Sequence, residues 1–111
     1  MTSGVPESDW KVFRDLRDVA LERFCQGVLD ELERVRLDAS RSHHQRYLDV
    51  YCLLREQDEK LARAFNDPRR STMTWQLAAI HALGLLTPDE LARLTPQTRH
   101  AVESAAKDVL R

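Results

Sequence analysis

Three charged side chains in the middle of the chain occupy positions that could support chemistry. Asp58 interrupts an apolar stripe that otherwise follows helical spacing, and Arg69 and Arg70 lie in the first turn of the next expected helix. An isolated buried carboxylate is very costly, and the positive N-terminal end of a helix disfavours arginine. We therefore expect these side chains to pair with one another or with a bound anion.

The expected helix start Asp67-Pro68-Arg69-Arg70-Ser71 has the composition of an anion site. Asp67 suits the N-cap position and Pro68 the first helical position. Free backbone N–H groups would then lie beside the guanidinium groups of Arg69 and Arg70 and the hydroxyl of Ser71. Such donors bind phosphate or carboxylate, so a site for a small anionic ligand is one interpretation. The other, which we favour, is a solvated turn in which one arginine pairs with Asp58 or Asp67. An acidic side chain of a protein partner would suit the same donors.

Asp58 is expected to join this site from the preceding helix, which carries Tyr47 and Tyr51 on the same face. The residue before a proline is pushed away from helical angles, so that helix should end near Asn66 and the chain should then reverse. In a shared pocket, the carboxylate and the two phenols could act in acid–base chemistry. The structural alternative, which we favour, is a buried Asp–Arg bridge that ties the two helices together.

The other candidates for chemistry lack the required spacing. His43 and His44 are adjacent, so on a helix they point about 100° apart and cannot chelate one metal ion together. The sequence contains no metal-binding motif, no Gly-rich phosphate loop and no nucleophile elbow. We therefore expect no metal, no cofactor and no catalytic residue, and we favour a protein that is not an enzyme.

A DNA-binding motif is the remaining alternative. Residues 86–92 look like the opening helix of many bacterial helix-turn-helix domains, and residues 97–100 look like the start of a recognition helix. The connection between them is too short, and the basic surface needed for phosphate contacts is lacking. A degenerate helix-turn-helix is thus a lesser alternative, and no nucleic-acid partner is expected.

Hydrophobic spacing and helix-start signals define the elements that would position these residues. Apolar residues recur every three or four positions, and Ser42 with Gln45 and Thr87 with Glu90 fit capping boxes. The expected helices cover residues 9–38, 43–66, 68–83, 88–94 and 96–109. The inner face of the second should carry Tyr47, Tyr51, Leu54, Leu61 and Phe65. Gly84 suits the left-handed position that ends a helix.

The fold class that follows is all-α, a small helical bundle of three main helices plus a short fourth and a C-terminal fifth. With 111 residues, residues 9–111 make a single helical domain after a flexible N-terminal tail, residues 1–8. The first helix would be about 45 Å long at 1.5 Å per residue. That exceeds what a compact domain of this size needs, so one end should protrude or meet a second copy.

Composition limits the partners. The net charge is −1 and the charges are evenly spread, which argues against nucleic acid and membrane surfaces. The sequence shows neither a signal peptide nor an apolar run of about 20 residues, so we expect a cytoplasmic protein. Arginine outnumbers lysine fourteen to three, which hints at a bacterial source. We expect an interaction or regulatory module that binds a protein partner or itself as a homodimer, with the small-ligand binder as the alternative.

Overall fold

Five α-helices and one 3₁₀ turn make up the described part of the chain, residues 5–109 of a computed structural model. They are α1 (Glu7–Arg36), α2 (His43–Phe65), the 3₁₀ turn η1 (Arg70–Thr72), α3 (Met73–Ala82), α4 (Pro88–Leu91) and α5 (Pro96–Val109). The all-α class is confirmed, and no strand occurs within residues 5–109. In this part of the chain, no helix is both long enough and apolar enough to cross a membrane.

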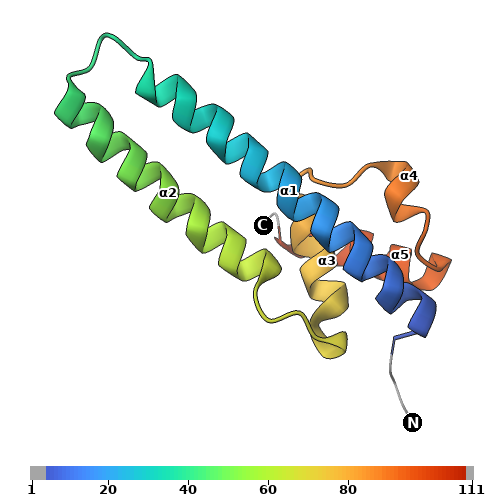
Figure 1. The fold of residues 1–111 in the computed structure, drawn as a ribbon. Helices are drawn as coiled ribbons and strands as arrows, with labels where there is room; N and C mark the ends of the chain where they lie inside the picture. The colour runs from blue at the N-terminus through green and yellow to red at the C-terminus, as the bar shows by residue number, and fades with distance from the viewer. Residues whose placement is uncertain (1–4, 110–111) are drawn as a thin grey trace.

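The two long helices form an antiparallel hairpin, and the shorter helices pack at only one end of it (Figure 1). The molecule is correspondingly elongated, with extents of 59 × 24 × 24 Å. α3 has 10 residues against 30 in α1, so it cannot follow the hairpin to its tip. We call the packed end the body and residues 25–61 of the hairpin the arm. The predicted protrusion of one end of the first helix is thus confirmed at its C-terminal end.

The hydrophobic core lies entirely in the body. α3 sits under the base of the hairpin and packs against α5 along its length (Figure 1). The largest fully buried apolar side chains come from four helices and are Phe13, Leu16, Phe65, Met73, Leu77, Ile80 and Val102. Phe13 and Leu16 of α1 and Met73, Leu77 and Ile80 of α3 are all buried in this core, where burial of apolar area is the main stabilising contribution.

Polar contacts join the ends of the helices in the body. Asp9 on α1 is 1% exposed and accepts hydrogen bonds from the backbone N–H of Thr95 (2.8 Å) and from the hydroxyls of Thr95 and Thr98 at the start of α5. The guanidinium of Arg17 donates to the carbonyl oxygen of Phe65, the last residue of α2. Both contacts satisfy helix-end groups that would otherwise lack partners.

Local helix signals in the sequence are confirmed. Both capping boxes form: Gln45 N donates to Ser42 Oγ (3.1 Å), and Glu90 N donates to Thr87 Oγ1 (3.1 Å), each with the reciprocal bond from the cap backbone. Gly84 has a φ of 74°, the left-handed conformation expected after α3. α1 begins at Glu7 instead of at residue 9, so residues 7 and 8 of the expected N-terminal tail are helical. Residues 1–4 of that tail lie outside the described residues.

The expected start of the third helix at Pro68 is wrong. Asp67 has a φ of 54° and is not a helix cap, the backbone at Arg69 is extended, and α3 begins only at Met73. The left-handed residue turns the chain sharply after α2, and η1 then delays the α-helix. The two arginines therefore lie in the connection, outside the first turn of α3.

Candidate interaction surface

The arm displays large apolar side chains and buries none of its residues. Every residue from 25 to 61 is described, and each is half-buried or exposed. The exposed apolar side chains of the arm, with exposed fractions between 44% and 69%, are Leu29, Leu37, Tyr47, Leu48, Tyr51 and Leu54. Large exposed apolar patches are often sites of interaction with other molecules.

A groove runs between the two arm helices, and helical spacing explains why apolar groups line it. On α1, Cys25, Leu29 and Leu32 recur at intervals of four and three, and so share one face. On α2, the matching face carries Tyr47, Tyr51, Leu54, Asp58 and Leu61. In the body, the same stripes continue as Phe24 and Phe65, which belong to the buried cluster that also contains residues of α3 and α5. The groove is therefore the uncovered continuation of the core.

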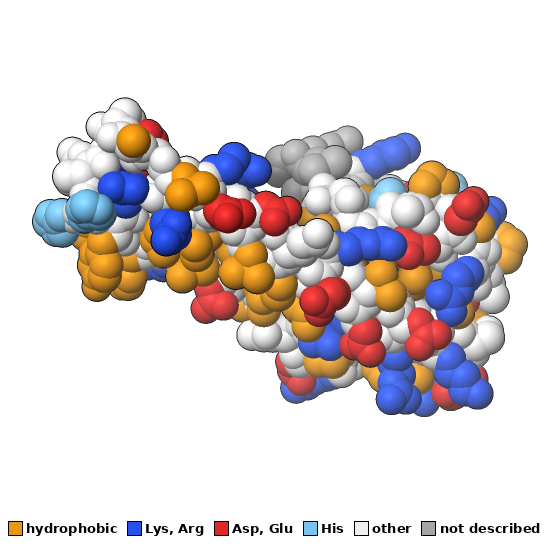
Figure 2. Space-filling view, turned by 45° about the horizontal axis from the view of Figure 1, so that its top comes forward, with side chains coloured by type: hydrophobic (Ala, Val, Ile, Leu, Met, Phe, Trp, Pro, Cys, Tyr) orange, Lys and Arg blue, Asp and Glu red, His pale blue; other side chains and the backbone are white. Residues whose placement is uncertain are grey.

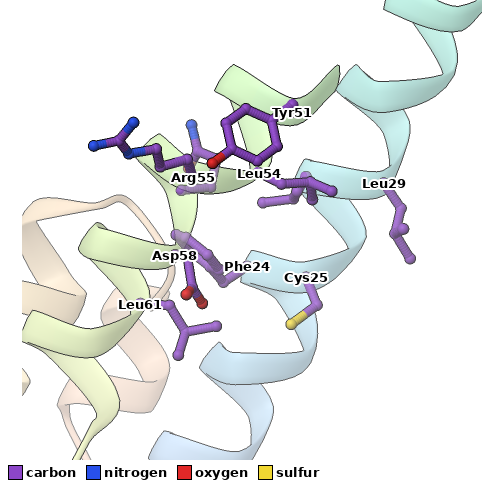
Figure 3. A pocket seen from close by; sticks show the side chains of 10 residues that line it. Phe24, Cys25, Leu29, Tyr51, Leu54, Arg55, Asp58 and Leu61 are labelled. Carbon is purple, nitrogen blue, oxygen red and sulfur yellow. The ribbon is translucent and has the colours of Figure 1, made fainter. Parts of the chain in front are cut away.

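The part of the groove nearest the body is an open hollow of about 550 Å³. Figure 3 shows Leu54, Asp58 and Leu61 of α2 on one side of it and Cys25 and Leu29 of α1 on the other. Asp58 is exposed, and the structure gives its side chain no hydrogen bond or ion pair with another described residue. The lining is thus mainly apolar, with one carboxylate, Asp58, and one guanidinium, Arg55.

A second hollow, of about 450 Å³, lies toward the tip of the arm and has a basic lining. Leu32 and Tyr47 line it together with Arg36, His43 and Arg46. Figure 2 shows hydrophobic side chains gathered along the protruding arm, from near its tip toward the body. The two hollows continue the same helical stripes, so they form two stretches of one groove.

The structure brings together only part of the predicted ligand site. Tyr51 and Asp58 share the hollow near the body, and Tyr47 lines the one near the tip. The expectation that Asp58 is buried, and that Tyr47, Tyr51 and Leu54 face a core, is wrong: all four are exposed. The physical reason is that no third helix reaches this part of the hairpin.

Arg69 and Arg70 lie beyond the C-terminal end of α2, in its connection to α3, and they pair with acidic residues other than Asp58. Arg69 forms an ion pair with Asp67 (2.7 Å), and Arg70 forms one with Glu7 (2.8 Å) while its guanidinium lies 5.2 Å from the centre of the Trp10 ring. The predicted bridge from Asp58 to these arginines is therefore absent from the described residues. Ser71 is exposed in η1, and an anion-binding role for this segment stays a prediction.

In the segment that looks like a recognition helix, residues 97–100, Thr98 is buried, Arg99 is half-buried and the other two residues are exposed. Thr98 is 8% exposed and donates its hydroxyl to Asp9, so it cannot contact another molecule. Within residues 5–109, no three His, Cys, Asp or Glu side chains are arranged to hold a metal ion. Comparison of the chain with protein families, curated proteins and solved structures finds no significant match.

The groove was missed by the sequence reasoning, but a signal for it exists. The apolar stripes of residues 9–38 and 43–66 are each far longer than any stripe in the rest of the chain that could cover them. Because these apolar helix faces are longer than the segments that could pack on them, part of each face is predicted to stay uncovered. The sequence pattern was used to predict only that one end of the first helix should protrude or meet a second copy.

Proposed function

We propose that this protein is a small cytoplasmic interaction module that binds a protein partner through the apolar groove of its arm. The observation that carries the proposal is that residues 25–61 expose six large apolar side chains and bury no residue. Groove-lining groups at intervals of three and four match the way amphipathic helices bind one another. The favoured partner surface is therefore helical and apolar.

The energetics indicate how much of the groove a partner must cover. Fully burying a large apolar side chain contributes about 1.5–3 kcal/mol, so a half-exposed one gains about 1 kcal/mol when covered. Six such side chains give about 6 kcal/mol, which is comparable with the estimated cost of association of about 4–15 kcal/mol. A contact with one or two of these side chains would be too weak, so the partner must cover the groove along most of its length.

The free thiols support the cytoplasmic part of the proposal. Cys52 on α2 is exposed and Cys25 lines the groove, and neither forms a disulfide in the structure. Exposed thiols persist in reducing compartments, whereas secreted proteins of this size commonly oxidise theirs.

The proposal is tested by comparing the full chain with a groove variant carrying Leu29→Lys and Tyr51→Lys. The matched control is Val19→Lys, which changes a 39% exposed apolar residue on the same helix α1 but outside the arm. A true partner, once purified, should slow amide hydrogen exchange in residues 25–61 of the wild type and of the control. The groove variant should lose that protection while keeping its circular dichroism spectrum. Equal binding by all three proteins would refute the proposal.

A further inference from the structure

The two halves of the arm carry opposite net charge. The base half, residues 25–31 and 54–61, has five acidic and two basic side chains and a net charge of −3. The tip half, residues 32–53, has four basic and three acidic side chains and a net charge of +1, with His43 and His44 counted as neutral. Among the charged residues that line the groove, Asp58 and Arg55 balance each other in the base half, whereas Arg36 and Arg46 make the tip half positive.

This polarity makes the groove complementary to itself in one orientation only. If two arms stack face to face with their tips at opposite ends, each tip half (+1) meets a base half (−3). With both tips at the same end, like charges would meet at both ends, which is unfavourable. The antiparallel arrangement also obeys two-fold symmetry, in which the same patch serves both copies.

The available area is sufficient for a specific dimer. Along α2 from His43 to Leu61 the groove face is about 28 Å long at 1.5 Å per residue. Two helices packed side by side at 8–10 Å present a face about 20 Å wide, or roughly 500 Å² per copy as a flat area. Two copies thus bury about 1,000 Å² before the relief of the side chains is counted, which reaches the size expected of a specific interface.

We infer that the partner that covers the groove is a second copy of this chain, and that the two arms pack antiparallel to form a four-helix bundle. The inference rests on the proposed function, because it names the occupant of the same groove. In the bundle, every helix has antiparallel neighbours, and the apolar stripes of both arms become a shared core. The two bodies then lie at opposite ends of the dimer.

The first experiment measures the mass of the purified full chain against concentration by sedimentation equilibrium. The expected result is a dimer for the wild type and for Val19→Lys. The variant with Leu29→Lys and Tyr51→Lys should be a monomer over the same range, with unchanged helix content. A wild type that is monomeric throughout, or a dimer that persists in the groove variant, would overturn the inference.

The second experiment tests the orientation by exchanging charges between the two ends of the groove. Asp58→Arg and Arg36→Glu should each raise the dissociation constant of the dimer at least about threefold, because the two-fold axis applies every change twice and a surface pair is worth up to about 1 kcal/mol. The double variant should return toward the wild-type value. Two single variants with no effect, or a double variant weaker than both, would overturn the antiparallel arrangement.

A distance measurement checks the same geometry without relying on charge. A spin label on Ala39→Cys, in a background with Cys25→Ala and Cys52→Ser, reports the separation of the two tips. Antiparallel arms place the tips at least about 25 Å apart, the length of the arm. Arms packed with their tips together would give about 10–15 Å, close to the spacing of neighbouring helices, and would refute this arrangement.

The outcomes separate the inference from the proposed function. If the chain is monomeric while a different purified protein protects residues 25–61 from exchange, the second-copy inference fails and the proposed function stands. If the chain is monomeric and a binding protein protects only the body, both fail. If the chain is a dimer that the groove variant does not disrupt, the second-copy inference fails because the contact lies elsewhere, and the hydrogen-exchange experiment alone then decides the proposed function.

Discussion

The buried carboxylate of Asp9 should be the most costly charged side chain to remove from this protein. It is 1% exposed, and it joins the first turns of α1 and α5 through three hydrogen bonds from Thr95 and Thr98. Replacement by alanine removes the acceptor of one backbone N–H and two hydroxyls, in a site where Thr98 is buried and Thr95 is half-buried. Asp9 and Thr95 are 86 residues apart in the sequence, so losing this contact also weakens the attachment of α5 to α1 in the body.

The magnitude follows from these three bonds. Hydrogen bonds to a charged group contribute about 1.5–3 kcal/mol each, but the buried carboxylate also loses its hydration, which offsets part of that sum. A net value of about 1 kcal/mol per bond gives about 3 kcal/mol for Asp9→Ala. With an unfolding entropy of about 2.1 cal/mol/K per residue, a chain of this length should then melt about 10–15 °C lower. Asp9→Asn keeps one acceptor oxygen and should lose less than half as much.

Thermal and urea unfolding followed by circular dichroism measure the effect. The matched control is Asp15→Ala on the same helix, where an exposed carboxylate forms an ion pair with Arg93 (3.1 Å) and should contribute less than about 0.5 kcal/mol. Equal losses for Asp9→Ala and Asp15→Ala would refute the reasoning. So would a loss for Asp9→Ala below about 0.5 kcal/mol, which is the range of ordinary surface substitutions.

Two further predictions concern pH and backbone conformation. The hydrogen bonds from Arg23 and from the backbone of Thr87 lower the pKa of Glu90 to about 2. The stabilising contribution of the Glu90 carboxylate is therefore present above about pH 4.5 and is lost as the pH falls toward 2. Urea titrations at several pH values should show this loss of stability, and Glu90→Gln should lessen it. Gly27 and Gly84 both have open space where a Cβ would lie, but only Gly84 has a positive φ (74°). Gly27→Ala should therefore raise stability by about 0.5–1 kcal/mol and Gly84→Ala should lower it by about 1–2 kcal/mol, and the same sign for both in thermal unfolding would contradict this account.

Asp9 also shows why sequence reasoning placed the buried carboxylate at the wrong position. Asp58 interrupts an apolar stripe, which predicts burial, whereas Asp9 begins the first expected helix and no pattern in the sequence marks it as buried. The structure reverses the two: Asp9 is buried and Asp58 is exposed. Burial raises the pKa of Asp9, but the hydrogen bonds from Thr98 and Thr95 outweigh it and hold the pKa below its usual value. Its contribution to stability is thus present above about pH 3.9 and is lost as the pH falls through the lowered pKa.

The features that the sequence predicted well are those that local chemistry determines. Capping boxes, the helix end at Gly84 and the bounds of α5 depend on neighbouring residues, and the structure has all of them. The features it missed depend on which segments meet in space. Nothing in the stripe of α2 shows that α3 ends too early to cover Tyr51 and Leu54, because that outcome is set by the length of another helix.

The tip of the arm shows how an uncovered hairpin can still have a defined shape. Arg41 forms a two-pronged ion pair with Asp49, and Arg46 donates to the carbonyl oxygen of Arg36 (2.6 Å), the last residue of α1. These bonds close the connection between the helices without burying an apolar group. Surface ion pairs contribute at most about 1 kcal/mol, so they order the turn but cannot replace a core.

The polar contacts at the tip hold the two arm helices together, and this favours the proposed binding of a partner in the apolar groove. Since the two helices are already joined at the tip and fixed at the base by Arg17 and Phe65, a partner need not order them on association. A groove that is formed before binding loses less conformational entropy, and more of the estimated 6 kcal/mol from apolar burial then appears as affinity. Arg41→Ala should accordingly weaken association while leaving the body's melting temperature unchanged, since the lost contact lies outside the core.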